Sequence, residues 1–346
     1  MKKYHDLGTA ENVLPLSMIG GLPTRNFTQG FFEGAEEISG EAFAEKHLTN
    51  KIACAHCPCG CIHLGSFREQ FAPDHGYKTV QVSYDYELIY ALGSNLSINS
   101  PYDILKLLHI IEKQGWDAIS MGVTLAWATE AYNYGVITSE HTDGLNVHFG
   151  DVKTYFEILR RITEGRNQFY RDLEKGAAYC GEKYGGAEFA IVFGKNEAPG
   201  YITGENAFTD WLLGVRHSHL DGAGYSVDQA TQPMTLEEQM KKLTGESIFR
   251  MLLNSLVICL FARKIYTNDL ILQGLEAVGE KRDQAWIDDF TRRVFKKKYD
   301  FKKACGFNPD DARLPEKLFR VTTAKGKIDR ERMKKRVELF KKMTGI

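Results

Sequence analysis

Four cysteines crowd into eight residues of this chain, at positions 54, 57, 59 and 61, although the whole sequence has only 7. Cys54, Cys57 and Cys61 follow a C-x2-C-x3-C spacing, which lets three thiolates converge on one inorganic centre. That pattern is typical of a [4Fe-4S] cluster whose fourth ligand comes from elsewhere in the chain. The best candidate for the fourth ligand is Cys259, which lies in an apolar run over residues 254–263.

Two other interpretations of the same cysteines stay open. With His56 and His63 nearby they offer ligands for a structural zinc ion, although zinc sites usually combine two ligand pairs separated by a longer loop. The thiols could also be inert or form a disulfide, but the spacing favours the cluster. In the cluster interpretation Cys59 is a spare thiol, and the isolated Cys180 and Cys305 are expected to be small buried hydrophobes.

Composition restricts the class of protein. The formal net charge is -1 and 43% of the residues are hydrophobic, which is typical of a soluble globular chain. No apolar run approaches the roughly 20 residues that cross a bilayer, and the first residues lack the apolar core of a signal peptide. We therefore expect no membrane span and a cytoplasmic location, where thiols stay reduced and clustered cysteines more often bind metal.

Periodic apolar residues predict helices in several segments from Ser100 onward. One helix is predicted between Ser100, a candidate N-cap, and Gly115, which ends its apolar repeat; Pro101 suits its first turn. Further helices are predicted over residues 151–165, 168–184, 235–243, 247–265, 268–278, 284–295 and 330–343. Strands are predicted over 78–84 and 188–193, and turn signals predict irregular backbone over 1–50. The expected fold class is mainly α, with two helical domains and small strand elements.

Basic residues gather at 292–298, 302–303 and 325–342. Such runs usually form solvated helix faces, and the sharper interpretation is a docking patch for an acidic protein partner. Nucleic acid is not expected as a partner, because the overall charge is close to neutral and no recognition motif accompanies the basic runs.

Several blocks, in order along the chain, together resemble the aldehyde:ferredoxin oxidoreductase family. They are LPTRNF at 22–27, AEEISGE at 35–41, the cysteine run, Tyr86 with Glu87, GWDAISMGVT at 115–124 and LPEKL at 314–318. Their ordered coverage is more specific than any single block. The resemblance implies a tungsten or molybdenum bis-pterin cofactor, with a bridging Mg²⁺, beside one [4Fe-4S] cluster.

The resemblance covers only part of the family's architecture. Members usually begin with a β-rich domain that forms a base under the pterins, and this chain resembles the two helical domains that follow, here residues 1–189 and 190–346. We expect the β-rich domain to be supplied by a partner subunit, although a truncated product is the alternative that the sequence leaves open.

The resemblance also implies cofactor ligands. Cys54, Cys57, Cys61 and Cys259 match the four cluster ligands. Each helical domain of the family carries a pterin motif D-x-x-G-L-(D/C), whose specified positions are here Glu112, Gly115, Trp116 and Asp117 in the first domain and Asn254, Val257, Ile258 and Cys259 in the second. Charge-assisted hydrogen bonds are roughly twice as strong as neutral ones, so an amide at Asn254 predicts weaker pterin binding on that side. For Gly115, an ordinary helix C-cap is an equally good explanation.

For the chemistry, Glu87 and His219 match the family's carboxylate and histidine beside the metal, as general base and hydrogen-bond donor. The implied reaction oxidises a small aldehyde to a carboxylic acid, or runs in reverse, and passes electrons through the cluster to ferredoxin or a similar carrier. Residues 197–204 resemble the family's pocket-lining stretch, without an arginine that commonly follows its tyrosine. One alternative is an electron-transfer or structural iron-sulfur subunit without pterin catalysis, and another is a zinc-stabilised helical protein.

Overall fold

The computed structural model describes residues 1–74, 76–222, 224–230 and 232–346. The chain forms two compact units. The first unit comprises Met1–Thr203 and Leu314–Ile328, and the second comprises Gly204–Arg313 and Asp329–Ile346. The expected domain boundary at residue 189 stays a prediction, because compact units need not coincide with the domains of a family.

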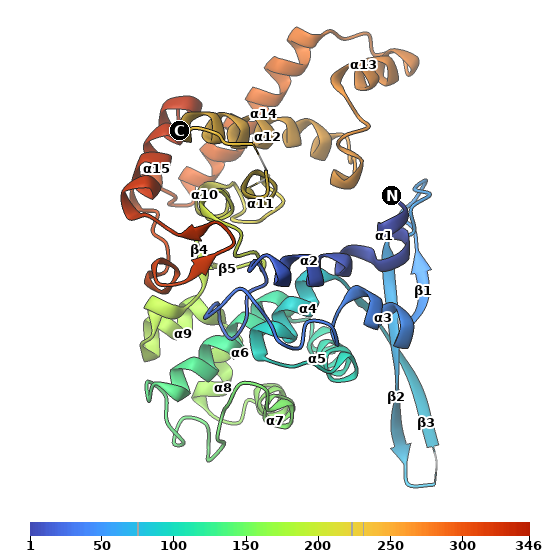
Figure 1. Ribbon diagram of the computed structural model, residues 1–346, viewed down its shortest axis with the longest axis vertical. Helices are drawn as coiled ribbons and strands as arrows, with labels where there is room; N and C mark the ends of the chain where they lie inside the picture. Colours follow the sequence, from blue (N-terminus) through green and yellow to red (C-terminus); the bar gives the residue numbers. More distant parts are fainter. Residues whose placement is uncertain (75, 223, 231) are drawn as a thin grey trace. The chain divides into compact units, whose positions relative to one another are not determined.

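Helices make up most of the regular secondary structure of the first unit (Figure 1). In chain order its helices are α1 (Lys2–Leu7), α2 (Val13–Met18), α3 (Gly40–Lys46), α4 (Tyr86–Leu92), α5 (Pro101–Gln114), α6 (Ala118–Asn133), α7 (Val152–Thr163), α8 (Gln168–Leu173) and α9 (Gly176–Tyr184). Its strands are β1 (Leu48–Ile52), β2 (Ile62–Ala72), β3 (Gly76–Tyr84), β4 (Val192–Phe193), β5 (Asn196–Glu197), β6 (Thr322–Thr323) and β7 (Gly326–Lys327).

Helix α6 lies at the centre of the first unit, against α4 on one side and α9 on another. Its sequence is apolar on all faces rather than on one stripe, which is typical of a helix surrounded by protein. Gly122 allows the contact with α4, because a Cβ at that position would lie 2.6 Å from the Ala91 carbonyl oxygen. The fully buried Trp127 fills the space on the α9 side, where its indole donates to the Gly186 carbonyl.

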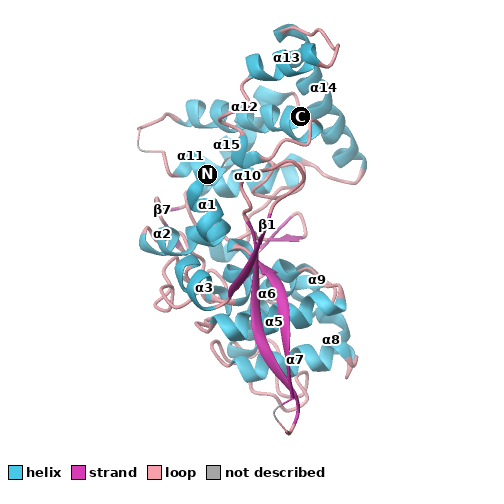
Figure 2. Cartoon of the chain, turned by 90° about the vertical axis from the view of Figure 1, so that its right-hand side faces the viewer, coloured by secondary structure: helices cyan, strands magenta, loops and turns pink. Residues whose placement is uncertain are grey.

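Strands β1, β2 and β3 form an antiparallel sheet in that order. Figure 2 shows β2 and β3 as a long ribbon beside α5. Along the first half of β2 the side chains alternate between buried and partly exposed, as expected for a sheet with one covered face. The sheet positions the cysteine loop, which connects β1 to β2.

The second unit is built from α10 (Glu205–Leu213), α11 (Gly224–Asp228), α12 (Leu236–Ser255), α13 (Asn268–Ala277), α14 (Gln284–Ala304) and α15 (Arg330–Thr344). Helix α10 is buried along its whole length. Its Glu205 carboxylate accepts hydrogen bonds from Arg332 and from the buried Arg336, which fastens α15 to it. Because both charges of a buried pair need a partner, removing either one should be strongly destabilising.

The mainly α fold class is confirmed, and so are the helix starts at Ser100, Asp151 and Thr235, whose side chains all cap the helix that follows. Other boundaries were wrong. One helix, Leu236–Ser255, replaces the two predicted over 235–243 and 247–265. Helix α14 continues beyond residue 295 to Ala304, and residues 168–184 divide into α8 and α9. The irregular stretch expected over 1–50 contains three short helices, and the long strand β2 was missed.

None of the helices in the described part of the chain combines the length and the apolarity that a bilayer-spanning segment needs.

Candidate functional site

The first pterin-like motif forms a helix corner, which we name the first corner (residues 112–117). Helix α5 ends at Gly115, whose φ of 75° lies in the left-handed region. The Gly115 N–H donates to the Glu112 carbonyl and the Trp116 N–H to the Ile111 carbonyl, which is the paired hydrogen bonding of a Schellman motif. Asp117 then caps α6, accepting from the Ser120 N–H at 2.7 Å.

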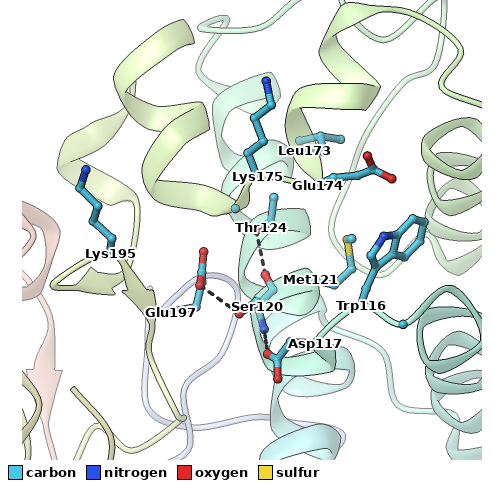
Figure 3. Close-up of a pocket in the computed structure, with 12 residues that line it drawn as sticks. Trp116, Asp117, Ser120, Met121, Thr124, Leu173, Glu174, Lys175, Lys195 and Glu197 are labelled. Atoms are coloured by element: carbon cyan, nitrogen blue, oxygen red, sulfur yellow. Dashed lines mark hydrogen bonds between the residues drawn. The ribbon is translucent and has the colours of Figure 1, made fainter. Parts of the chain in front are cut away.

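A pocket of about 340 Å³ opens beside the first corner (Figure 3). Three of the predicted residues line it, namely Gly115, Trp116 and Asp117. The rest of its lining comes from α6, from the α8–α9 region and from residues just before and in β5, and consists of Ser120, Met121, Thr124, Leu173, Glu174, Lys175, Gly176, Lys195 and Glu197. Glu112, the remaining residue of the first motif, lies exposed on α5.

Glu197 is the most constrained carboxyl group in this pocket. It accepts hydrogen bonds from the Ala177 N–H at 2.9 Å and from the Ser120 hydroxyl at 3.0 Å. Burial raises the pKa of Glu197 above its ordinary value, because the charged form loses solvation. Gly176 permits its approach, since a Cβ there would lie 2.6 Å from a Glu197 carboxyl oxygen.

Charge of both signs surrounds the pocket. Lys175 and Lys195 carry amines and Asp117 and Glu174 carry carboxylates, and all four are exposed, whereas Glu197 is half-buried. In Figure 3, Ser120 lies between Glu197 and Trp116, and the indole of Trp116 forms the other side of the opening. Such a lining suits a planar ligand that has several N–H donors and an anionic group.

The second pterin-like motif forms the second corner (residues 254–259), in the second unit. Helix α12 ends at Ser255, and Val257 adopts a φ of 57°. The Val257 N–H donates to the Asn254 carbonyl and the Ile258 N–H to the Leu253 carbonyl, so the hydrogen bonding repeats that of the first corner. Ile258 packs against Leu253 and its neighbours, whereas Val257 is 92% exposed.

Cys259, at the last position of the second motif, has an exposed thiol. Its backbone angles, φ -62° and ψ 134°, are close to those of Asp117, φ -70° and ψ 125°. Asp117 caps a 16-residue helix with its side chain, whereas Cys259 precedes a three-residue 3₁₀ turn without a side-chain cap. The same backbone therefore presents a capping carboxylate in one unit and an accessible thiol in the other.

The cysteine loop between β1 and β2 carries thiols of different accessibility. Cys54 is exposed, Cys57 and Cys61 are half-buried, and Cys59 is buried. The Cys57 N–H donates to the Cys54 carbonyl, and the Cys59 N–H points at the Cys57 Sγ at 3.5 Å. Cys59 itself is held in the unit, since its carbonyl lies 2.7 Å from His5 Nδ1.

The donor chemistry of this loop fits a thiolate-bound cluster, because three thiols in one loop are accessible and an amide N–H already points at one sulfur. The thiols do not yet converge: across residues 1–74, 76–222, 224–230 and 232–346, no three His, Cys, Asp or Glu side chains form a group that could hold a metal ion. Cys54, Cys57 and Cys61 belong to the first unit and Cys259 to the second.

Glu87, the predicted general base, lies in the first turn of α4, after the cap residue Asp85, which accepts from the Leu88 N–H at 3.0 Å. Its carboxylate is half-buried and accepts a hydrogen bond of 2.6 Å from the Tyr201 hydroxyl. Periodicity and spacing gave no sign of this pair, because the two residues are 114 positions apart.

His219, the predicted hydrogen-bond donor, lies in a loop of the second unit that two buried groups hold. Asp221 accepts from the Arg216 N–H at 2.7 Å and from the Ser218 N–H at 3.2 Å. Arg250, which is 1% exposed, donates to the His219 carbonyl at 3.2 Å.

His217, two residues before His219, has a different environment. Its Nδ1 lies 2.7 Å from the Trp211 carbonyl, and burial lowers the pKa of His217 to about 4. His217 is therefore neutral at physiological pH, and its ring is hydrogen-bonded to the backbone of its own unit.

Residues that the sequence interpretation did not single out are Ser120, Lys175 and Lys195. Lys175 and Lys195 are ordinary surface lysines in the sequence, and only the packing of α8, α9 and β5 around the first corner brings them to the pocket. Of residues 197–204, which resemble the family's pocket-lining stretch, only Glu197 lines this pocket, and the role of the stretch stays a prediction.

Comparison with known proteins gives the family. A family model described as "Aldehyde ferredoxin oxidoreductase, domains 2 & 3" matches residues 1–345. The tungsten-containing aldehyde ferredoxin oxidoreductase of Pyrococcus abyssi is 36% identical over 200 residues, which is 56% of this chain and 31% of that protein. The WOR-like subunit of an aliphatic sulfonate oxidoreductase from Pyrococcus furiosus is 31% identical over 143 residues, or 41% of this chain and 22% of that subunit.

A solved structure supports the fold. It is a chain of the active-site complex BamBC of benzoyl coenzyme A reductase, solved with 1,5-dienoyl-CoA, and it matches this protein at a TM-score of 0.76 and 14% sequence identity. The match covers 99% of this chain and 57% of the chain in that complex. This chain spans less than a third of the length of the curated relatives. The match over residues 1–345 shows that the chain belongs to the aldehyde ferredoxin oxidoreductase family of oxidoreductases and spans its domains 2 and 3.

Proposed function

We propose that this chain forms the helical part of a tungsten or molybdenum bis-pterin oxidoreductase that converts an aldehyde to a carboxylic acid. In that reaction the aldehyde and one water yield the acid, two protons and two electrons. The observation that carries the proposal is the pocket at the first corner, where Gly115, Trp116 and Asp117 of the motif meet the half-buried Glu197.

The pocket fits one pterin of the cofactor by its chemistry. A pterin ring is flat and bears amine and amide N–H donors along one edge, which carboxylates bind more strongly than neutral acceptors do. Asp117 and Glu197 would offer carboxyl oxygens, Trp116 would offer an aromatic face, and Lys175 and Lys195 would offer positive charge for a phosphate, which a bound Mg²⁺ would also help to neutralise. At the second corner, Asn254 and Ile258 would hold the other pterin more weakly, since Asn254 has no charge.

Cys54, Cys57, Cys61 and Cys259 would hold the [4Fe-4S] cluster. When bound, the metal and the cluster supply the two-electron oxidation and the one-electron transfer to ferredoxin or a similar carrier. Cluster binding would require the cysteine loop to draw its thiols together, which is feasible because Cys54, Cys57 and Cys61 are not fully buried.

Two residues would move or hold protons in the reaction. Glu87 would take a proton from the attacking water as general base. His219 would donate a hydrogen bond to the carbonyl oxygen of the substrate, where negative charge develops as the water attacks. The assembly would further need the β-rich domain that the family resemblance implies.

A second candidate function is an electron-transfer or structural iron-sulfur subunit without pterin. The second corner favours it, because Asn254 and Val257 replace the carboxylate and the glycine of the motif that the family resemblance implies. A cluster held by the four cysteines would survive those replacements.

Elemental analysis separates these functions. The protein is purified anaerobically, alone and as the complex captured from its native cells, and iron, tungsten, molybdenum and zinc are measured by mass spectrometry. Iron at about four atoms per chain, with tungsten or molybdenum in the complex, is the expected result. Iron without either metal would favour the electron-transfer subunit, and zinc in place of iron would contradict both.

A kinetic test addresses Glu87. In the active complex, Glu87→Gln should lower aldehyde-dependent turnover by roughly a hundredfold or more while leaving the metal content unchanged, because general-base catalysis contributes about that much. Full activity in this variant would remove Glu87 from the proposed mechanism.

A further inference from the structure

Two tyrosines of α4 hold the segment at residues 198–201. The Tyr86 hydroxyl donates to the Gly200 carbonyl, and the Tyr90 hydroxyl donates to the Ala198 carbonyl at 3.2 Å. Both tyrosines are fully buried, and burial raises the pKa of each well above its ordinary value. They therefore remain protonated donors, one helical turn apart on the same face of α4.

The segment is also fixed by its own backbone. The Ala198 N–H donates to the Ile191 carbonyl and the Ile202 N–H donates to the Gly21 carbonyl, so both ends are bonded to neighbouring chain. Gly200 has a φ of 98°, and a Cβ there would lie 2.3 Å from the ring of Tyr90. Only glycine allows this close approach, and the position of the next residue, Tyr201, is therefore well defined.

Tyr201 uses this support to reach Glu87. Its ring lies against the ring of Tyr86, with centroids 4.8 Å apart and planes inclined by 34°, and only 5% of the residue is exposed. Its hydroxyl donates to Glu87 Oε1 at 2.6 Å, which is in the range of a short bond to a charged acceptor. The donor is thus held from behind while the carboxylate stays accessible in part.

We propose that Tyr201 is a positioning residue for Glu87, whose hydroxyl fixes the orientation of the carboxylate and favours its charged form. The inference rests on the proposed role of Glu87 as general base. A base must be deprotonated and aligned before the substrate arrives, and a hydrogen bond to the charged form supplies both conditions. The titratable groups of α4 beside Glu87 are Asp85, which caps the helix, and the buried Tyr86 and Tyr90.

The first experiment uses the chain alone. Glutamate carboxyl carbons are labelled with ¹³C, the Glu87 resonance is identified by its loss in Glu87→Gln, and its protonation is followed by NMR against pH. In Tyr201→Phe the ring and its stacking remain, and the midpoint of the Glu87 titration should rise by about one pH unit, a tenfold change in proton affinity. An unshifted midpoint would overturn the proposal.

Two further proteins control for structural damage. Tyr155→Phe removes another buried tyrosine hydroxyl of the same unit, which lies 2.9 Å from the Thr129 hydroxyl, and should leave the Glu87 midpoint unchanged. Fluorinated tyrosine at position 201 makes the hydroxyl a stronger donor and should lower the midpoint. A shift in the same direction in all three variants would contradict a specific hydrogen bond.

The second experiment uses the assembled enzyme. The acidic limb of the pH dependence of kcat/KM should move in Tyr201→Phe by the same amount as the NMR midpoint, while tungsten or molybdenum content stays constant. If Glu87→Gln is fully active, the proposed base is wrong whatever Tyr201 does. If Glu87→Gln is inactive but Tyr201→Phe leaves both profiles unmoved, the positioning role alone is wrong.

Discussion

The first and second corners have one backbone and two different chemistries. Both end a helix with a left-handed residue and the same pair of hydrogen bonds, and both place an extended residue two positions later. The first corner uses Gly115, for which a positive φ costs nothing, and the second uses Val257, for which it is strained. A helix corner can therefore adopt the same shape with a residue for which that shape is unfavourable.

Tertiary packing explains how the second corner keeps its shape. Ile258, directly after the strained residue, packs against a buried group that includes Leu252 and Leu253. Strained residues persist where their surroundings over-determine the backbone, at a cost of about 1–3 kcal/mol each. Because Val257 is 92% exposed, its own side chain offsets little of that cost.

The largest expected effect is a difference in iron content between substitutions of Cys259 and Asp117, the last residues of the two corners. Cys259→Ser should remove most of the iron and the brown visible absorbance, because Cys259 is the proposed fourth cluster ligand. Asp117→Ser at the corresponding position should leave the iron unchanged, since serine also caps a helix. Iron content and absorbance of anaerobically purified protein are the measurements.

The control for that comparison is Cys305→Ser, which changes another exposed cysteine of the second unit. It should keep its iron. Equal iron in Cys259→Ser and Cys305→Ser would remove Cys259 from the ligand set and separate the second corner from the cluster.

The next effect is the cost of turning the first corner into the second. Gly115→Val should lower the free energy of unfolding by about 1–3 kcal/mol, because valine is strained at a φ of 75°. A Cβ at this position has no atom within 4 Å, so no steric overlap adds to the change. Urea unfolding measures it, and a variant as stable as the wild type would show that the corner relaxes to another backbone.

The reverse change should stabilise the second corner. Val257→Gly removes the strain but adds conformational entropy to the unfolded chain, and we expect a net gain of about 1 kcal/mol in the free energy of unfolding. Val278→Gly is the matched control, because this valine also follows a helix and is 75% exposed, but its φ is -96°. A gain in both variants would argue against strain at Val257.

The smallest effect concerns Glu197, which faces the first corner across its pocket. Burial raises the pKa of Glu197 above 4.5, so the folded state holds its proton more tightly than the unfolded state does. The resulting stabilisation is complete below pH 4.5 and is lost as the pH rises through the folded-state pKa. The stability of Glu197→Gln relative to the wild type should therefore increase as the pH rises. Denaturant titrations at several pH values measure it, and a stability difference that does not change with pH would contradict a raised pKa of Glu197.

Local sequence signals predicted much of the fold. Ser100 and Gly115 bracket α5 as expected, and Asp151 and Thr235 begin α7 and α12. The break predicted between residues 243 and 247, where Gly245 lies, is absent, because buried residues on both sides of it, among them Leu243 and Arg250, pack α12 in place as one helix. An isolated glycine weakens a helix by only about 1 kcal/mol, which packing readily outweighs.

The candidate site was less predictable, since its members come from distant parts of the chain. Ser120 and Glu197 are 77 positions apart, and Glu87 and Tyr201 are 114 apart. Neither pair leaves a periodic or local signal. The spacing of Cys54, Cys57 and Cys61 did predict a set of ligands, because three thiols that bind one cluster from a single loop must lie a few residues apart in the sequence.

By itself the sequence determined the features that depend on neighbouring residues: the caps of the helices, the left-handed corner at Gly115 and the spacing of the thiols. Only the tertiary structure decided which side chains meet. It brings Glu197 to the first corner, seats Tyr201 against Glu87 and keeps Val257 in a conformation that valine disfavours. The physical reason is that caps and turns follow from short-range hydrogen bonds, whereas a pocket and a strained residue depend on burial energy gathered from the whole unit.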